Sequence, residues 1–291
     1  MIAGKGFHFA DGEELSPSSN YLLSIRDIHA KGGNCVFSSG LIMKPKIVIL
    51  CAMWKNRRVE AVTFAHLARL KRRVARKCTL LPIAIGSEGD ASRHSAKSHK
   101  IKYVEANHVP LGGKWNVGWN EALKIECDAI VLVGADAIIT KSAIETYVRW
   151  LKSSFEFCMP TGVSMFNPRI KKSVQIQHLN GARRYHTVGS GRAFRYEFAQ
   201  RIGENPFQHS LHANLERTLS QTMALEVEFG RGVSMPVDKF GHIIEIKTKE
   251  DVTLMSTSQK DGVTFRVDDP SYTMSLIDDR RTAELIQSIW P

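Results

Sequence analysis

Residues 128–139 read Asp128-Ala129-Ile130-Val131-Leu132-Val133-Gly134-Ala135-Asp136-Ala137-Ile138-Ile139. A run of apolar residues rich in Val and Ile is typical of a strand buried on both faces of a parallel sheet. The run ends in small residues and one carboxylate, Asp136. Ligands of open α/β sheets bind outside the carboxyl ends of the strands. Asp136 is therefore a candidate ligand of a hard cation that bridges phosphates. The alternative is an aspartate that only turns the chain before the next helix.

The segments around this run alternate between strands and helices. The hydrophobic pattern predicts strands at 47–52, 79–86 and 101–104, helices at 58–76, 115–125 and 142–151, and a polar loop at 87–100. Such alternation predicts a parallel, doubly wound sheet. Beyond residue 155 the pattern changes to short β-like pieces at 157–166, 174–178, 225–229 and 242–246, with helices at 195–202 and 211–222. The predicted fold class is therefore α/β, with a mostly parallel central sheet and a mixed C-terminal half.

The size and charge of the chain bound its function. Its 291 residues suffice for one large α/β domain with additions, or for two small domains. Forty Lys and Arg residues against 29 Asp and Glu residues give a net charge of +11. Such a charge attracts nucleic acid, anionic membranes or phosphorylated small molecules, although a basic surface without a partner is the simpler alternative.

Two further features concern location and redox state. The longest apolar run, residues 47–53, is too short to cross a bilayer, and residues 1–11 lack a signal-peptide pattern. A cytoplasmic protein without a membrane span is therefore expected. The five cysteines are scattered, without the spacing of a zinc or redox motif. Cys51, Cys127 and Cys158 lie in or beside apolar segments and are predicted to be small buried hydrophobes.

Polar and glycine-rich segments follow four predicted strands. These segments are Met53–Arg57, Gly86–Asp90, Gly112–Asn116 and Gly134–Ala137. Together they predict one crevice with groups for a base or ribose, a cation for phosphate and a carboxylate for a metal. Gly112-Gly113-Lys114 at a helix start suits phosphate, because free backbone amides and the helix dipole add to the lysine. The chain has no G-x-G-x-x-G, and this segment lacks the Walker spacing.

As an ordered set, these segments resemble the GT-A nucleotide-sugar glycosyltransferases, specifically the family-2-like enzymes common in phages and prophages. The matching segments are Ile47–Asn56, Leu111–Gly118, Ala129–Ile139, Gly189–Phe194, Asn214–Leu219 and Ile244–Thr248. The resemblance runs from about residue 44 to 253. It implies an N-terminal extension at 1–43, a GT-A domain at 44–250 and a C-terminal extension at 251–291 that packs on the domain. Relatives that add sugars to modified bases of phage DNA fit the basic charge of this chain.

The resemblance also implies roles for single residues at the nucleotide-sugar donor. Ala52, Trp54 and Asn56 would line the nucleotide base, Glu88 would hold the base or ribose, and Lys114 and Asn116 would face the nucleotide and its phosphates. Gly134, Ala135 and Asp136 would form the family's Asp-x-Asp element, and Asp136 would bind a divalent metal, Mn²⁺ or Mg²⁺. This chain has Gly134 in place of the first Asp and Ala137 after Asp136, which puts the use of a metal in doubt. His242 is a second candidate metal ligand, or else a surface histidine at a strand end.

The acceptor side is implied by later segments. Glu216 would be the base that takes the proton of the acceptor hydroxyl. The alternative is an exposed helical glutamate paired with Arg217 or Arg192. Arg192 would contact a phosphate or the acceptor. Arg183, Arg184 and Tyr185 combine charge with a stacking group, which suits DNA, whereas a solvated loop is the simpler interpretation.

The sequence therefore predicts transfer of a sugar from a UDP-glucose-like donor to a hydroxyl acceptor, with a hydroxymethylated pyrimidine in phage DNA as the favoured acceptor. Three alternatives stay open. These are a transferase acting on a cell-surface glycan or lipid, a metal-dependent nucleotidyltransferase, and a non-catalytic DNA-binding protein on a decayed transferase scaffold. The nucleotidyltransferase would need a second nearby carboxylate, whereas the missing first Asp at Gly134 favours the decayed scaffold.

Overall fold

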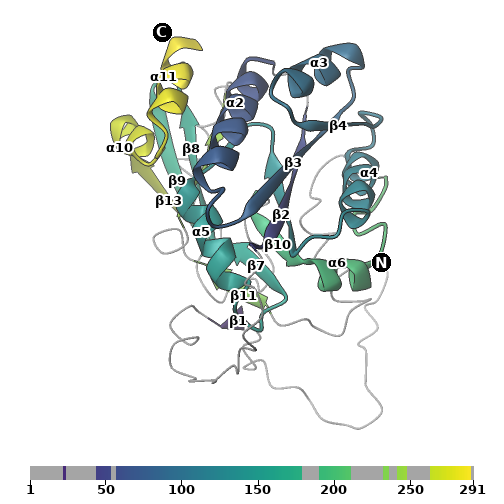
Figure 1. Cartoon of the computed structure of the whole chain (residues 1–291). Helices are drawn as coiled ribbons and strands as arrows, with labels where there is room; N and C mark the ends of the chain where they lie inside the picture. Colours follow the sequence, from purple (N-terminus) through teal and green to yellow (C-terminus); the bar gives the residue numbers. More distant parts are fainter. Residues whose placement is uncertain are drawn as a thin grey trace, which may run out of the picture.

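The structure is a computed structural model that describes residues 22–23, 44–53, 57–178, 190–210, 232–235, 241–247 and 263–289. It contains two sheets, one of eight strands and one of five. Figure 1 labels the elements along the chain. The helices are α2 (Arg57–Arg73), α3 (Asp90–Ser98), α4 (Leu111–Leu123), α5 (Lys141–Trp150), α6 (Tyr196–Ile202), α10 (Pro270–Ser275) and α11 (Arg280–Ile289).

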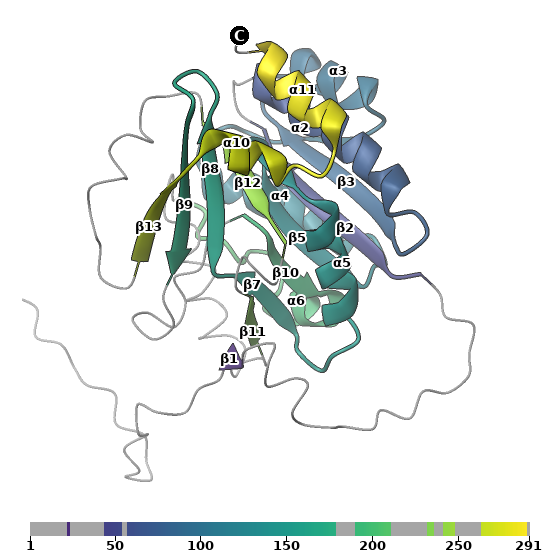
Figure 2. The same ribbon diagram turned by 90° about the vertical axis from the view of Figure 1, so that its left-hand side faces the viewer.

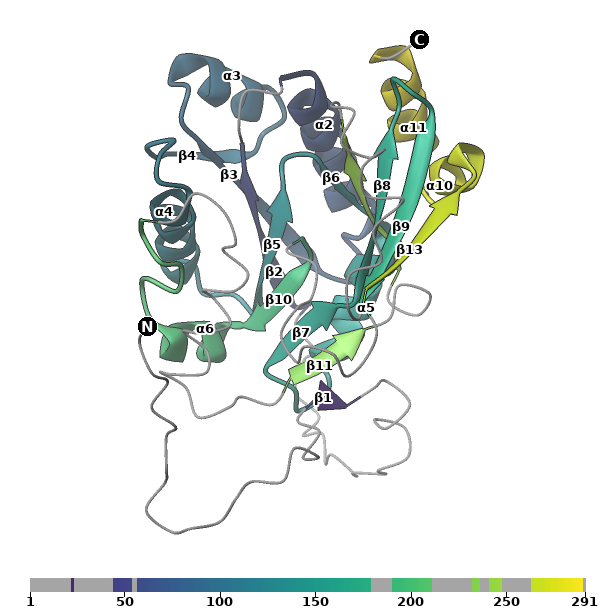
Figure 3. The same ribbon diagram turned by 180° about the vertical axis from the view of Figure 1, so that it is seen from behind.

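The large sheet has a parallel half and a mixed half. Its strands in spatial order are β1 (Leu22–Leu23), β11 (Gly232–Met235), β7 (Phe157–Pro160), β10 (Arg192–Arg195), β5 (Ala129–Gly134), β2 (Lys46–Ala52), β3 (Thr79–Gly86) and β4 (Lys102–Glu105). Strands β5, β2, β3 and β4 are parallel, whereas β10 runs antiparallel between β5 and β7 (Figure 3). The predicted α/β class with a mostly parallel sheet and a mixed C-terminal half is confirmed.

The small sheet is built mainly from the second half of the chain. Its strands in spatial order are β13 (Val263–Asp268), β9 (Lys172–His178), β8 (Gly162–Asn167), β12 (Ile243–Ile246) and β6 (Ala137–Ile139). Strand β6 directly follows the turn after β5, so this turn joins the two sheets. Helices α10 and α11 lie beside the small sheet (Figure 2).

Helices cover both faces of the large sheet because its central strands are apolar on both sides. Ile47, Ile49 and Cys51 of β2 pack in a core that includes α2 and α5. Val48 and Leu50 point the other way, into a core that includes α4 and α6. This alternation is what the unbroken apolar run of a doubly covered strand requires.

Most predicted elements of the first half form, within a few residues of their expected limits. Two expectations are wrong. The predicted loop at 87–100 contains α3, whose buried side chains are only Ser92 and Ala96, so the sequence shows almost no apolar stripe. The apolar pattern of Tyr21–Ile28 also favours a short helix, but its two described residues, 22–23, form β1, which pairs with β11. Pro82 fits β3 because β4 pairs only with residues 83–86.

Cys51, Cys127 and Cys158 are buried and free, as predicted. Burial raises the pKa of each of these thiols. The predicted pieces at 211–222 and 225–229 lie outside the described residues. Within the described part of the chain, no helix combines the length and the hydropathy needed to cross a bilayer.

Helix α11 is attached to α2 by a buried polar cluster. Asp279 accepts hydrogen bonds from Arg69 Nε and Thr282 Oγ1, both at 2.6 Å. The ring of His66 contacts Thr282 Oγ1 at 3.0 Å and the Ile139 carbonyl at 2.7 Å. The side chains of His66, Thr282 and Arg69 hold the pKa of Asp279 well below its usual range.

The substitution Asp279→Asn is expected to lower the free energy of unfolding by about 2 kcal/mol at pH 7, because it removes the charge that Arg69 faces. A carboxyl group with a depressed pKa stabilises the fold above its unfolded pKa of about 4 and loses this contribution as the pH falls. The difference between the two proteins should therefore shrink from pH 4 towards pH 2. Chemical denaturation across pH measures it, with the exposed Asp90→Asn as control. A difference independent of pH would contradict the prediction.

Candidate functional site at the carboxyl edge of the large sheet

The carboxyl ends of β2, β3 and β5 meet at one edge of the large sheet. The amide of Met53 after β2 donates to the Ile85 carbonyl at 2.9 Å, and the amide of Ala135 after β5 donates to the Ala52 carbonyl at 3.3 Å. These bonds hold the three strand ends together. The edge is where an open α/β sheet binds its ligand, and it includes the predicted site residues Ala52, Gly134, Ala135 and Asp136.

Asp136 is half-exposed, and its carboxylate faces a lysine that follows β12. The Asp136 Oδ2 atom accepts a hydrogen bond from Lys247 Nζ at 2.9 Å, and the Asp136 side chain is 36% exposed. Its backbone carbonyl accepts from the amide of Ile246 at 2.7 Å. Gly134 leaves room for this arrangement, because a Cβ atom there would lie 2.5 Å from Asp136 Oδ1.

Lys247 also contacts Glu245, so that one ammonium group joins two carboxylates. The distance from Lys247 Nζ to Glu245 Oε2 is 2.8 Å, and the Glu245 side chain is 12% exposed. Ser190 Oγ donates to the other oxygen of Glu245 at 3.0 Å and accepts from the Gly134 amide at 3.4 Å. We call Asp136, Ser190, Glu245 and Lys247 the edge cluster. Because β10 is antiparallel to β5, Ser190, two residues before β10, lies at the carboxyl end of β5.

The charge of Lys247 is fixed by its neighbours. Partial burial by itself lowers its pKa, but the carboxylates of Glu245 and Asp136 outweigh this effect and raise the pKa well above its ordinary value. The ammonium therefore stays protonated across the physiological range.

The two predicted metal ligands do not meet. Strand β12 pairs antiparallel with β6, with Glu245 opposite Ala137 and Ile243 opposite Ile139. Asp136 therefore lies opposite Ile246, whereas the His242 amide donates to Thr140 Oγ1 at 3.1 Å. Four residues of strand separate the two positions, about 13 Å. Among the described residues no group of three His, Cys, Asp or Glu side chains is placed to hold a metal ion. The edge cluster as it stands does not fit a divalent cation, because Lys247 already contacts both of its carboxylates.

Lys114 lies at the same edge but inside the protein. Its side chain is 1% exposed, and its ammonium donates to the Met53 carbonyl and, at 3.1 Å, to Ser87 Oγ. Burial lowers the pKa of Lys114, while the carboxylates of Glu60, Glu88 and Glu105 act in the opposite direction. Lys114 thus ties the end of β2 to the segment after β3.

The start of α4 is packed against another part of the chain. A Cβ atom on Gly112 would lie 2.1 Å from the backbone oxygen of Gln208, and one on Gly113 would lie 2.7 Å from the ring of His209. The two glycines therefore permit a close approach of residues 208–209, in the space where the sequence suggested phosphate. The amide of Asn116 is buried and exchanges two hydrogen bonds with the Phe207 backbone, at 2.8 and 3.0 Å.

Of the other predicted site residues, two are described by the structure and six are not. Glu88 is partly buried, with its Oε2 atom 4.0 Å from Arg57 Nε, and Arg192 of β10 is buried opposite Leu132. Trp54, Asn56, Arg183, Arg184, Tyr185 and Glu216 lie outside the described residues. The sequence predicts no role for Glu245 or Lys247, which belong only to the matching segment Ile244–Thr248. The alternation in Ile244-Glu245-Ile246-Lys247 was the signal that places both polar side chains on one face.

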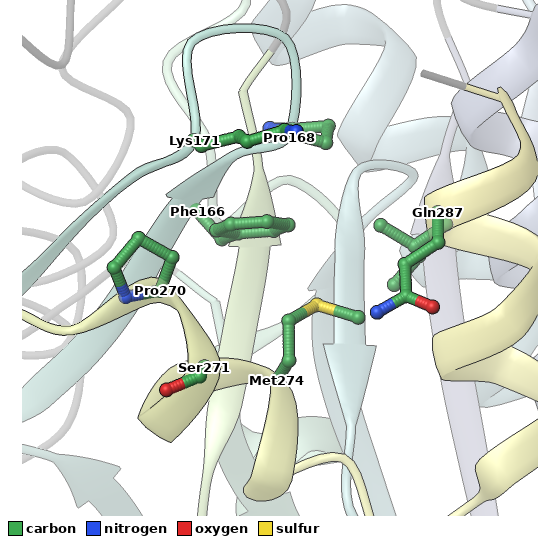
Figure 4. A pocket seen from close by; sticks show the side chains of 8 residues that line it. Phe166, Pro168, Lys171, Pro270, Ser271, Met274 and Gln287 are labelled. Atoms are coloured by element: carbon green, nitrogen blue, oxygen red, sulfur yellow. The ribbon is translucent and has the colours of Figure 1, made fainter. Parts of the chain in front are cut away.

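A separate cavity of about 560 Å³ lies beside the small sheet. It is lined by Phe166, Pro168, Lys171, Pro270, Ser271, Met274, Ile286 and Gln287. Figure 4 shows Phe166 and Met274 facing it from β8 and α10. None of the predicted site residues lines this cavity.

No protein-family model and no curated protein sequence matches the chain. Solved structures do resemble it. The mannosyltransferase PcManGT of Pyrobaculum calidifontis, in complex with GDP-Man and Mn²⁺, matches with a TM-score of 0.50 and 14% identity over 74% of this chain and 61% of that one. The present chain thus spans about three fifths of the length of that enzyme.

Two further structures match with lower scores. Glucosyl-3-phosphoglycerate synthase of Mycobacterium tuberculosis, in complex with Mg²⁺ and UDP, has a TM-score of 0.47 and 11% identity over 72% of this chain and 74% of that one. Mannosyl-3-phosphoglycerate synthase of Rubrobacter xylanophilus has a TM-score of 0.46 and 10% identity over 77% and 84%. The structural likeness to the mannosyltransferase, at 14% identity, shows the fold alone and not the reaction. The strand order, the mixed second half and the match to the mannosyltransferase together show that this chain has the fold of the GT-A nucleotide-sugar transferases.

Proposed function

We propose that this protein is a glycosyltransferase that moves a sugar from a nucleoside-diphosphate sugar to a hydroxyl group of an acceptor. The observation that carries the proposal is the edge cluster, which lies at the carboxyl end of β5 in a sheet of GT-A topology. Charged, partly exposed side chains that converge at this edge are expected where such a sheet binds its ligand.

The reaction requires stabilisation of the negative charge on the leaving diphosphate. As the acceptor oxygen bonds to the anomeric carbon, the bond from that carbon to the phosphate oxygen breaks, and the diphosphate leaves with the electron pair. The acceptor proton passes to a base, the role that the resemblance gives to Glu216. Positive charge beside the leaving diphosphate lowers the barrier, and Lys247 is the partly exposed cation of the edge cluster.

We further propose a UDP-glucose-like donor and, as acceptor, a hydroxymethylated pyrimidine of phage-type DNA. The net charge of +11 supports a polyanionic acceptor. A base inside a duplex would have to be flipped out to reach the site. The DNA acceptor is proposed from charge and resemblance, and it can fail without the glycosyl transfer itself failing.

The test uses purified protein with radiolabelled UDP-glucose or GDP-mannose and three acceptors: hydroxymethylated DNA, unmodified DNA and a lipid or glycan extract. Label in hydroxymethylated DNA alone is the expected result. Label in the lipid or glycan alone would overturn the acceptor. No transfer with any acceptor, together with no binding of UDP or GDP, would overturn the reaction and favour a non-catalytic protein.

The substitution Asp136→Asn is expected to reduce transfer about tenfold, or about 1.4 kcal/mol, because it removes one of the two charges that position Lys247. Transfer rates at saturating donor measure the effect. Asp278→Asn is the matched control, since Asp278 is an aspartate of similar exposure whose carboxylate pairs with Arg73, outside the edge cluster. Equal rates for the Asp136 variant and the wild type would remove the edge cluster from the proposed site.

A further inference from the structure

The position of Lys247 is fixed by its backbone as well as by its side chain. Its amide donates to the Phe166 carbonyl at 2.8 Å, which extends the pairing of β12 with β8 by one residue. The side chain then reaches two carboxylates that come from different segments, the turn after β5 and strand β12. A lysine held at both ends in this way has little freedom to leave the edge cluster.

The ammonium of Lys247 contacts the same carboxylate to which the family resemblance assigns the metal. A divalent cation binds a carboxylate oxygen at about 2.0–2.2 Å. Lys247 Nζ lies 2.9 Å from Asp136 Oδ2 and 2.8 Å from Glu245 Oε2. An ion bound to both oxygens would have to displace the ammonium, so the lysine and the ion exclude each other.

We propose that Lys247 takes the place of a divalent cation, so that the edge cluster binds the diphosphate of a nucleotide without a metal. This inference rests on the proposed function and specifies its site. An ammonium group has three N–H donors, and Lys247 uses two of them for Asp136 and Glu245. The third has no acceptor among the described residues, and the side chain is 30% exposed, so a phosphate oxygen can accept from it.

The charges of the edge cluster set the strength of this binding. Two carboxylates with one ammonium leave one net negative charge, whereas the same carboxylates with a divalent cation would be neutral. The edge cluster with Lys247 therefore binds an anion more weakly than the same carboxylates with a divalent cation would. Its affinity for the anion falls as salt screens the single ammonium. The same reasoning predicts that removing Lys247 leaves two carboxylates close enough to share one ion.

The first experiment measures Mn²⁺ binding without nucleotide, by electron paramagnetic resonance. Wild type and Lys247→Arg, which keeps a cation in place, are expected to bind no Mn²⁺ at this site. Lys247→Ala is expected to bind one ion, and the double variant Lys247→Ala with Asp136→Asn is expected to lose it. Circular dichroism and thermal melting establish that each variant folds. Mn²⁺ binding by the wild type that Asp136→Asn abolishes would overturn the inference.

The second experiment measures UDP and GDP binding by calorimetry, in EDTA and in Mn²⁺. The wild-type affinity is expected to change less than about twofold between the two, while Lys247→Ala loses about tenfold in EDTA and regains it in Mn²⁺. Lys77→Ala is the control, since Lys77 is an exposed lysine paired with Glu145. A tenfold gain of wild-type affinity in Mn²⁺ would overturn the inference. If no nucleotide binds, the proposed function fails, while the resonance experiment still decides whether Lys247 excludes the ion.

Discussion

The substitution Trp119→Ala is expected to lower the free energy of unfolding by about 3–5 kcal/mol. Trp119 is fully buried in the core between α4 and the large sheet, where its ring contacts Phe194 and Phe207 edge to face. Its Nε1 atom donates to the Gly203 carbonyl at 2.9 Å. Alanine leaves a cavity and an unpaired carbonyl, and both terms destabilise the fold.

Chemical denaturation of matched variants separates these terms. Trp119→Phe keeps most of the ring and loses only the hydrogen bond, so it should cost about 1–2 kcal/mol. Val117→Ala lies in the same helix at an exposed position and should change the free energy of unfolding by less than about 0.5 kcal/mol. An effect of Trp119→Ala as small as that of Val117→Ala would contradict the burial of Trp119 against Phe194 and Phe207.

The substitution Lys114→Met is expected to lower the free energy of unfolding by about 3 kcal/mol, although methionine fills a similar volume. The Lys114 ammonium donates hydrogen bonds to the Met53 carbonyl and to Ser87 Oγ, and it lies near the buried carboxylate of Glu60. Removing one partner of a buried charge pair leaves the other charge uncompensated. The exposed Lys102→Met, which breaks a surface pair with Glu121, is the control and should cost less than about 1 kcal/mol.

The loss of stability caused by Lys114→Met is expected to grow as the pH rises. Burial lowers the pKa of Lys114 in the folded protein. Between that pKa and the ordinary lysine value, the unfolded chain binds a proton that the folded protein has lost, so this group makes stability rise with pH. Lys114→Met lacks this contribution, and the difference in the free energy of unfolding between wild type and variant should widen as the pH rises towards the ordinary lysine pKa of about 10. A gap that narrows there would show that the carboxylates, not burial, control the pKa.

The sequence predicted the scaffold well because the scaffold depends on short-range patterns. Apolar runs such as 129–133 are long enough to specify buried strands. The small edge helix α3 was missed because a helix that buries only Ser92 and Ala96 carries little hydrophobic periodicity. Where one strand meets another depends on register, which no local pattern contains.

The dependence on strand register also explains why the contacts at the candidate site could not be predicted from the sequence. Asp136 and His242 were grouped by their places in the chain, and the antiparallel pairing of β6 and β12 separates them. That pairing brings Lys247 to Asp136 instead. The sequence assigns Lys114 and the glycines before it to phosphate from their place at a predicted helix start, and in the structure these residues pack against Met53, Gln208 and His209. The sequence shows which side chains are charged or polar, but it does not show which partner each side chain contacts.

The Asp136 carboxylate occupies the space that a side chain at position 134 would need, which has a consequence for how this chain can diverge. A Cβ atom at position 134 would lie 2.5 Å from Asp136 Oδ1, so a side chain there requires the Asp136 carboxylate to shift. Because Lys247 contacts the other oxygen of this carboxylate, we expect the effect of a substitution at position 134 to depend on the residue at position 247.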